Sequence, residues 1–255
     1  MAFNCLRFLT FLAVWSVVGF AFAADSRPEQ VELFAAIEAE QVEVRLIPKN
    51  VEQATVIIKN RTNRPLRINM PKAFAGIPVL AQNNNNNSGG GSSSGNQTMG
   101  GGMGGGMMGG GMGGGMGGGM FDVGPERVGK IKVGIVCLEH GKEDPNPRVA
   151  YEMKPIEEFT TDRATIEVLK MLAAGQIDQV AAQAAAWHFT DGLSFNQLAS
   201  KVKVKHLNGS VEMYFNGPQL QTALQAVSVA RRKAALAAPP ETASPGEIAD
   251  ANVSR

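Results

Sequence analysis

The feature that most constrains the fold is a long stretch, Asn83–Gly119, made almost entirely of Asn, Gly, Ser and Met. Gly-rich chain has the most backbone entropy to lose on folding and few side chains to bury, so we expect this stretch to be disordered. The segment before it is too short for a comfortable core of its own. Because each doubling of a flexible loop costs only about 0.6 kcal/mol, we interpret the stretch as an insertion within one sheet domain.

The first residues, Met1–Ala23, have the pattern of a secretory signal peptide. Arg7 precedes the apolar run Phe8–Phe20, and Ala21–Ala23 is a small-x-small cleavage site. An uncleaved anchor is the alternative. No second apolar run is long enough to span a bilayer, so we expect a mature chain that is secreted, periplasmic or at the cell surface. The formal net charge of +1 gives no indication of nucleic-acid binding.

Residues 24–153 are predicted to form a β lobe, because apolar and polar side chains alternate along several short runs separated by turn residues. A short amphipathic helix is expected at Val31–Glu40. The predicted strands are Val42–Ile47, Gln53–Lys59, Leu66–Met70, Ile77–Ala81, Val128–Glu139 and Val149–Met153. Pro78 favours an edge position for the fourth of them.

Residues 154–236 are predicted to form a helical lobe, and 237–255 a disordered tail. Helices are expected from a Thr161 or Asp162 cap to Ala174, over Ile177–Phe189, from Ser194 to about Val202, and over Gln219–Leu236. Gly175 is the expected stop of the first, and Ser194 with Gln197 forms a capping box. The predicted fold class is therefore α+β: a small antiparallel β-sandwich packed against about four helices.

Cys137 is the only cysteine after the predicted signal peptide, so it has no intramolecular partner for a disulfide. In an oxidising compartment such a residue is a buried inert thiol, a partner in an intermolecular disulfide or a reactive thiol. On a strand it shares a face with Val133 and Ile135. The sequence leaves these three possibilities open.

Gln183 lies on the border of the apolar stripe of its predicted helix, on the same face as Val180 and Trp187. A buried amide needs a hydrogen-bond partner, and loop backbone is the simplest one. A second reading is chemical. The thiol of Cys137 would attack the carboxamide of Gln183, release ammonia and leave an internal thioester that an outside amine can open.

The run Gln183-Ala184-Ala185-Ala186-Trp187 resembles the Thr-Gln-x-Ala-x-Trp signature of thioester domains in bacterial surface adhesins. Cys137-Leu138-Glu139 is similar to the Cys-Leu-Asp/Glu segment of that family. The resemblance spans about a quarter of the chain and implies covalent attachment to amines on an unknown partner surface. It makes Cys137 and Gln183 the bond partners, supported by Trp187, Ala185, Glu139 and His140. The chain departs from the family pattern at Ala182 and Val136, and its tail lacks a wall anchor.

Other chemistries have weaker signals, and we expect no enzyme activity, metal or cofactor. Cys137 with His140 or His188 could suggest a cysteine hydrolase, but such nucleophiles usually lie at a helix N-terminus rather than in a strand. The three histidines, His206 included, lack metal-ligand spacing. The methionines of the Gly-rich stretch could bind Cu(I), yet no His or Cys there would tighten a site. The alternative function is a plain secreted interaction module whose cysteine is inert or forms an intermolecular disulfide, with no thioester.

Overall fold

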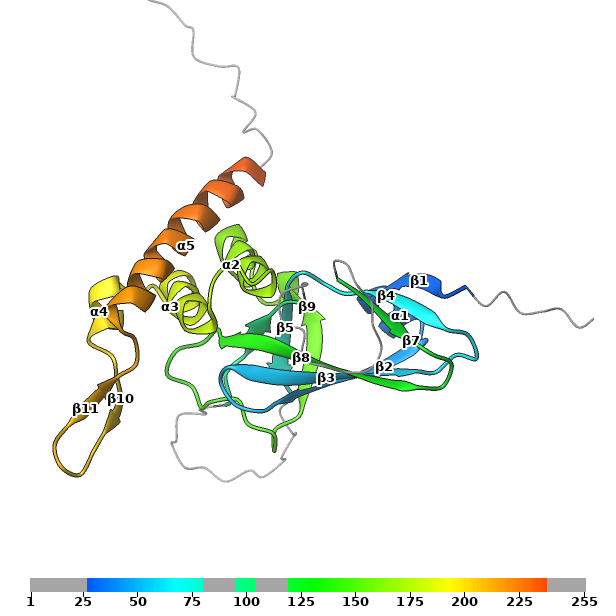
Figure 1. Ribbon diagram of the computed structural model, residues 1–255, viewed down its shortest axis with the longest axis horizontal. Coiled ribbons are helices and arrows are strands. Elements are labelled where there is room, and N and C mark those ends of the chain that lie inside the picture. Colours follow the sequence, from blue (N-terminus) through cyan, green and yellow to red (C-terminus); the bar gives the residue numbers. More distant parts are fainter. Residues whose placement is uncertain (1–26, 80–94, 104–118, 238–255) are drawn as a thin grey trace, which may run out of the picture.

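The computed structural model describes residues 27–79, 95–103 and 119–237 (Figure 1). The predicted signal peptide, and the predicted tail apart from Ala237, lie outside these ranges. The described chain has the predicted mixed α+β composition, with a strand-rich part followed by a helical lobe. Within these ranges, no helix is both long and apolar enough to cross a membrane.

The main sheet is a closed barrel of six strands in the order β2-β3-β8-β6-β5-β9. Its strands are β2 (Val42–Pro48), β3 (Gln53–Asn60), β5 (Phe74–Pro78), β6 (Met99–Gly101), β8 (Val128–Cys137) and β9 (Tyr151–Pro155). Leu46 pairs with Tyr151, which joins β2 to β9 and closes the ring. The predicted two-sheet sandwich is therefore not confirmed, and β5, expected at an edge, lies between two neighbours.

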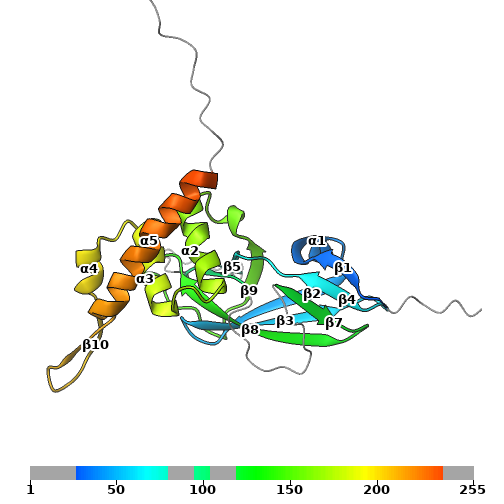
Figure 2. The same ribbon diagram turned by 45° about the horizontal axis from the view of Figure 1, so that its top comes forward.

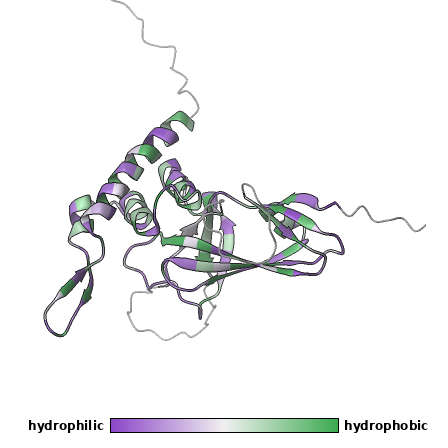
Figure 3. Ribbon diagram, in the orientation of Figure 1, coloured by the Kyte–Doolittle hydropathy of each residue, from purple (hydrophilic) through white to green (hydrophobic). Residues whose placement is uncertain are grey.

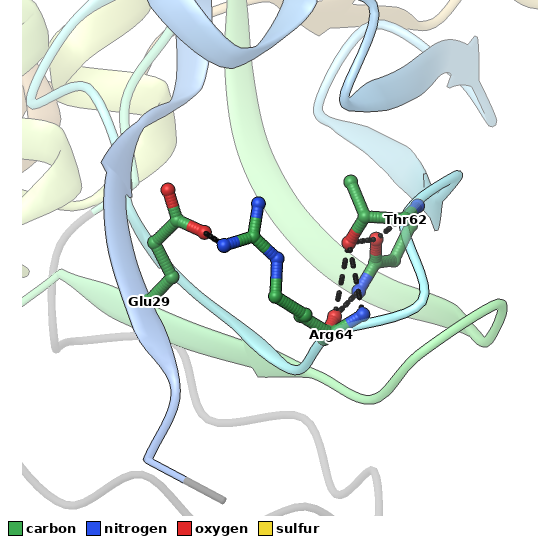
Figure 4. A network of polar contacts seen from close by, with 4 residues as sticks. Glu29, Thr62 and Arg64 are labelled. Carbon is green, nitrogen blue, oxygen red and sulfur yellow. Dashed lines mark hydrogen bonds and ion pairs between the residues drawn. The ribbon is translucent and has the colours of Figure 1, made fainter. Parts of the chain in front are cut away.

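A smaller three-stranded sheet lies beside the barrel, in the order β1 (Glu29–Glu32), β4 (Leu66–Asn69) and β7 (Met120–Val123). The short helix α1 (Leu33–Glu38) follows β1, so only part of the helix predicted at Val31–Glu40 forms. The turn before β4 is held by side chains (Figure 4). The Thr62 hydroxyl donates to the Arg64 carbonyl at 3.0 Å, and the Arg64 guanidinium lies 3.2 Å from the carboxylate of Glu29.

Strand β6 corrects the prediction that all of Asn83–Gly119 is disordered, because Met99–Gly101 of that stretch forms a strand of the barrel between β5 and β8. Met99 is fully buried there. The glycines allow close packing: a Cβ on Gly100 would lie 2.9 Å from a Leu138 side-chain carbon, and one on Gly102 would lie 2.1 Å from the Lys72 carbonyl oxygen. Composition alone gave no indication of this role for glycine.

The helical lobe contains η1 (Ile156–Glu158), α2 (Arg163–Ala173), α3 (Gln179–Thr190), α4 (Phe195–Ala199) and α5 (Gly217–Ala237). The predicted caps are confirmed. Asp162 accepts from the backbone N–H groups of Ala164 and Thr165, and Ser194 forms the capping box with Gln197. Figure 2 shows the long α5 lying across α2 and α3 at one end of the barrel.

A hairpin that was not predicted, β10 (Val202–Lys205) and β11 (Val211–Met213), leaves the helical lobe between α4 and α5. All of its strand residues are exposed. Hydrophobic and hydrophilic residues alternate along it, and it extends away from the rest of the molecule (Figure 3). Lys201 and Tyr214 form its base, because the Tyr214 N–H donates to the Lys201 carbonyl at 2.8 Å.

Strand β8 connects two hydrophobic cores. Val133 and Ile135 belong to the core inside the barrel. Val136, Cys137 and Leu138, at the end of the strand, belong to the core shared with α2, α3 and α5. The end of β8 is therefore the place where barrel and helices meet.

Candidate functional site

Cys137 lies at the end of β8, where only one of the two neighbouring strands, β6, still pairs with it. On one side, β6 continues beside it, with Met99 directly opposite. On the other side, pairing with β3 ends where Gln53 faces Gly134, and the Ile135 N–H makes the last backbone bond there, to Glu52 at 2.9 Å. The polar backbone groups of Cys137 therefore need another partner, because burying them unpaired is costly.

Helix α3 supplies that partner. Asp178 caps the helix by accepting from the Ala181 N–H. Gln179 and Gln183, one turn apart on the same face, both reach the backbone of β8. The Gln179 amide donates to the Ile135 carbonyl at 2.8 Å. Gln183 Oε1 accepts from the Cys137 N–H, and its Nε2 donates to the Cys137 carbonyl, both at 2.8 Å. The two glutamines thus extend the ladder where β3 stops.

Both members of the predicted pair are buried, each with 1% of its surface exposed. Burial raises the pKa of the Cys137 thiol well above its usual range, and the negative charge of Asp144 acts in the same direction. The sulfur is therefore held as a thiol rather than a thiolate. This environment also excludes the water that would hydrolyse an activated acyl group.

The hydrogen bonds between Gln183 and Cys137 have a chemical consequence. Oε1 lies 2.8 Å from the Cys137 nitrogen. Adding a carbonyl bond of about 1.2 Å puts the carboxamide carbon within about 4 Å of that nitrogen. Oε1 would carry the negative charge if the thiol attacked this carbon. The Cys137 N–H is already aimed at that oxygen, as a donor in an oxyanion hole is.

Trp187 lies one turn after Gln183 on α3, and its ring packs against three other rings. Its centroid is 4.9 Å from that of His140, 5.3 Å from that of Tyr214 and 6.0 Å from that of Phe215. Its Nε1 is buried and has no hydrogen-bond partner within the described part of the chain. Trp187 therefore lies next to Gln183 on α3 and carries a donor that is unsatisfied within the described ranges.

Ala185 and Glu139 are close in sequence to the pair but have structural roles. Ala185 is fully buried in the core between barrel and helices. Partial burial acts to raise the pKa of Glu139, but hydrogen bonds from Lys142 and Thr98 outweigh it and the pKa is lowered. Its carboxylate accepts from the Thr98 N–H at 2.8 Å, next to β6. Glu139 therefore anchors the segment that leads into β6.

His140 binds a residue that sequence reasoning missed. Its Nε2 lies 2.7 Å from Lys201 Nζ, and its backbone N–H donates to Asp191 at 2.9 Å. Burial lowers the pKa of His140, the charge of Lys201 lowers it further, and Asp191 opposes both. A neutral imidazole accepts one hydrogen bond from the ammonium. No spacing pattern pointed to Lys201 or Tyr214, because the unpredicted hairpin brings both to the site.

The other candidates form no metal site among the described residues, or, like Met107 and Met112 of the Gly-rich stretch, lie outside them. Among the described residues, no group of three or more His, Cys, Asp or Glu side chains is placed to hold a metal ion. His188 binds the Leu193 carbonyl and Arg231. A cavity of about 270 Å³ lies between β8 and the α2–α3 connection, next to Gln179, and neither Cys137 nor Gln183 lines it.

Comparison with known proteins adds no identification: no protein-family model, curated protein or solved structure matches this chain.

Proposed function

We propose that this protein is an exported, non-enzymatic attachment domain in which Cys137 and Gln183 form an internal thioester. The thioester would later join the protein covalently to an amine on a partner surface. The observation that carries the proposal is the mutual hydrogen bonding between the Gln183 carboxamide and the Cys137 backbone. It brings the two residues together from different lobes and aims a donor at the oxygen that must hold charge.

In the first step, a bond forms between Cys137 Sγ and the Gln183 carboxamide carbon. The bond from that carbon to Nε2 breaks, the thiol proton moves to the departing nitrogen, and ammonia leaves. In the second step, a primary amine attacks the same carbon. The carbon–sulfur bond breaks, the amine proton goes to the sulfur, and an amide links Gln183 to the partner. Each step exchanges one bond for another, so no oxidant or reductant is needed.

Burial supports storage of the activated group, because both residues are almost fully shielded from water. The raised pKa of the Cys137 thiol means that attack has to begin from the neutral thiol or from a small thiolate fraction. Formation is therefore expected to be slow. A reaction performed once per molecule during maturation tolerates a slow step.

The hydrogen bonds between Gln183 and Cys137 also favour a second function, because they have a purely structural effect. Both hydrogen bonds of Gln183 satisfy backbone groups that β3 leaves unpaired. A residue with only this role would make the protein a plain secreted interaction module, with Cys137 as an inert buried thiol. The two functions predict the same fold and different covalent structures, so mass decides between them.

Intact mass spectrometry of the purified protein is the test. The thioester predicts a mass lower by one ammonia, restored to the full value in Cys137→Ala and in Gln183→Ala. Gln179→Ala is the matched control, because it removes an amide one turn away that does not bind Cys137, and it should retain the deficit. Addition of an alkylamine should convert the deficit into one amine adduct and expose one alkylatable thiol. Full mass in the unsubstituted protein would instead support the interaction module.

A further inference from the structure

The ammonium group of Lys201 occupies a position built for a cation. Its Nζ lies 5.0 Å from the ring centroid of Trp187 and 5.6 Å from that of Tyr214. His140 Nε2, 2.7 Å away, supplies a hydrogen-bond acceptor. Two aromatic faces and one neutral acceptor are the components that proteins use to bind alkylammonium groups. Burial lowers the pKa of Lys201, and the Asp144 carboxylate opposes this shift with a charge that favours a cation here.

This cation position adjoins the pair described above. Trp187 lies one turn after Gln183 on α3, on the same helix face. His140 follows Cys137 by three residues, just beyond the end of β8. Tyr214 comes from the hairpin base and packs against the hydrophobic core that contains Trp187 and Cys137. Through Trp187 and His140, Lys201 therefore lies beside the two segments that carry Gln183 and Cys137.

A second, independent feature points to a ligand. The indole Nε1 of Trp187 is buried, with 4% of the residue exposed, and it has no acceptor within the described ranges. A buried donor without a partner is uncommon and usually has a reason. A carbonyl oxygen beside an incoming amine would satisfy it, and Lys201 does not, since its ammonium has no acceptor atom.

We infer that Trp187, Tyr214 and His140 form a binding subsite for a primary alkylammonium group, and that Lys201 fills it in the free protein. The incoming amine enters by displacing Lys201. The chemical class is a protonated lysine side chain of a partner, with at least one N–H for His140 and a neighbouring carbonyl oxygen that can accept from Trp187 Nε1; n-butylammonium stands in for its amine end. Binding of an ammonium group at the subsite does not require the thioester, whereas the effect of the subsite on amine capture rests on the proposed thioester.

Fluorescence can test binding without any acyl chemistry. The chain has two tryptophans, Trp15 and Trp187. A full-length Trp15→Phe, Cys137→Ala protein leaves Trp187 as the reporter and forms no thioester. We expect n-butylammonium, at pH 7, to change its emission at a concentration at least about tenfold lower when Lys201→Met is added, because a tethered competitor is removed. Lys201→Arg keeps a cation on the rings and should resemble the parent.

Two results would overturn the inference. One is equal butylammonium affinity with Lys201 and with Lys201→Met. The other is equal binding of n-butanol, which has the same alkyl chain without the charge. Neither result depends on a thioester. If the unsubstituted protein has its full mass, the proposed function is wrong, but these binding measurements still decide whether the subsite exists.

Where the mass deficit is present, capture kinetics give a second test. Lys201→Met in the otherwise unsubstituted protein should speed n-butylamine adduct formation by about tenfold, matching the gain in affinity. Lys201→Arg should leave the rate near that of the parent. An unchanged rate in Lys201→Met argues against displacement. A Lys201–Gln183 cross-link in peptide maps would also overturn the inference, because Lys201 would then be the acyl acceptor.

Discussion

The Gln183 side chain forms hydrogen bonds with both backbone polar groups of Cys137, each at 2.8 Å, across the boundary between barrel and helices. It replaces the strand neighbour that Cys137 lacks after β3 ends. Because both residues are buried, water cannot take over these bonds if the amide is removed. The contact therefore stabilises the fold whether or not a covalent bond follows.

Gln183→Ala should lower the free energy of unfolding by about 3 kcal/mol, because two buried backbone groups lose their partners at roughly 1–3 kcal/mol each. Urea denaturation at constant slope would measure the loss. Using Cys137→Ala as the background removes any thioester, so the difference reports hydrogen bonding and packing alone. Gln179→Ala should cost less, since that amide is only partly buried and binds carbonyls alone. Equal losses at both positions would contradict the assigned role of Gln183.

The raised pKa of the Cys137 thiol predicts alkaline destabilisation. Above about pH 8.5 the unfolded thiol ionises, while the folded thiol keeps its proton, so the native state binds more protons and stability falls as pH rises. The contribution is roughly 1.4 kcal/mol per pH unit. Gln183→Met keeps the thiol free of any thioester. Between pH 8.5 and 10, the unfolding free energy of Gln183→Met should fall more steeply than that of the double variant that also carries Cys137→Ala. Parallel curves of unfolding free energy against pH would disprove the buried thiol.

Features that depend on neighbouring residues in sequence could be predicted, and features that depend on strand register could not. Asp162, Ser194 and Gly175, which has φ of 67°, end or begin helices as expected, because capping is decided within one turn. Strand β6 was missed because Gly100 within it and Gly102 just after it allow close approach to Leu138 and Lys72, which are distant in sequence.

In the candidate site, too, some features follow from local sequence and others depend on strand pairing. Helical spacing and the resemblance predicted that Cys137 and Gln183 would meet, and in the structure the Gln183 amide binds the backbone of Cys137. That Gln183 binds backbone groups depends on β3 ending its pairing at Gly134, which no local pattern reveals. Lys201 and Tyr214 meet Trp187 at the base of a hairpin that no local pattern predicted. Whether the thioester forms stays a prediction.

Gly102→Ala should be far more harmful than an ordinary substitution in a Gly-rich stretch. The new Cβ would lie 2.1 Å from the Lys72 carbonyl oxygen and 2.6 Å from Ala173 Cβ, so backbone has to move. We expect a loss of about 2–3 kcal/mol, measured as a lower melting temperature. Gly217→Ala is the matched control, because nothing lies within 4 Å of a Cβ there. Equal melting temperatures for the two variants would show that the residue directly after β6 is not packed against Lys72 and Ala173 as described.

Asn60→Ala should destabilise the turn that joins the barrel to the small sheet. The buried amide of Asn60 donates to the carbonyls of Arg64, Val123 and Gly124 at 2.7, 3.1 and 3.0 Å. Losing these partners should lower the unfolding free energy by about 3 kcal/mol or more. Thr62→Val, which removes a hydroxyl at the exposed side of the same turn, should cost less than 1 kcal/mol. Similar losses in urea denaturation would contradict the central role of Asn60.

His140 should make the protein less stable in mild acid. Burial lowers its pKa, with the charge of Lys201 acting in the same direction and Asp191 opposing. Between the ordinary histidine pKa of about 6.5 and the lower folded value, the unfolded state binds the additional proton, so stability decreases as pH falls through this window. An NMR titration of the His140 ring would give the pKa directly. Lys201→Met should raise that pKa by removing a neighbouring positive charge, and His140→Gln should flatten the stability curve between pH 5 and 7. A His140 pKa that Lys201→Met leaves unchanged would show that the two side chains do not interact.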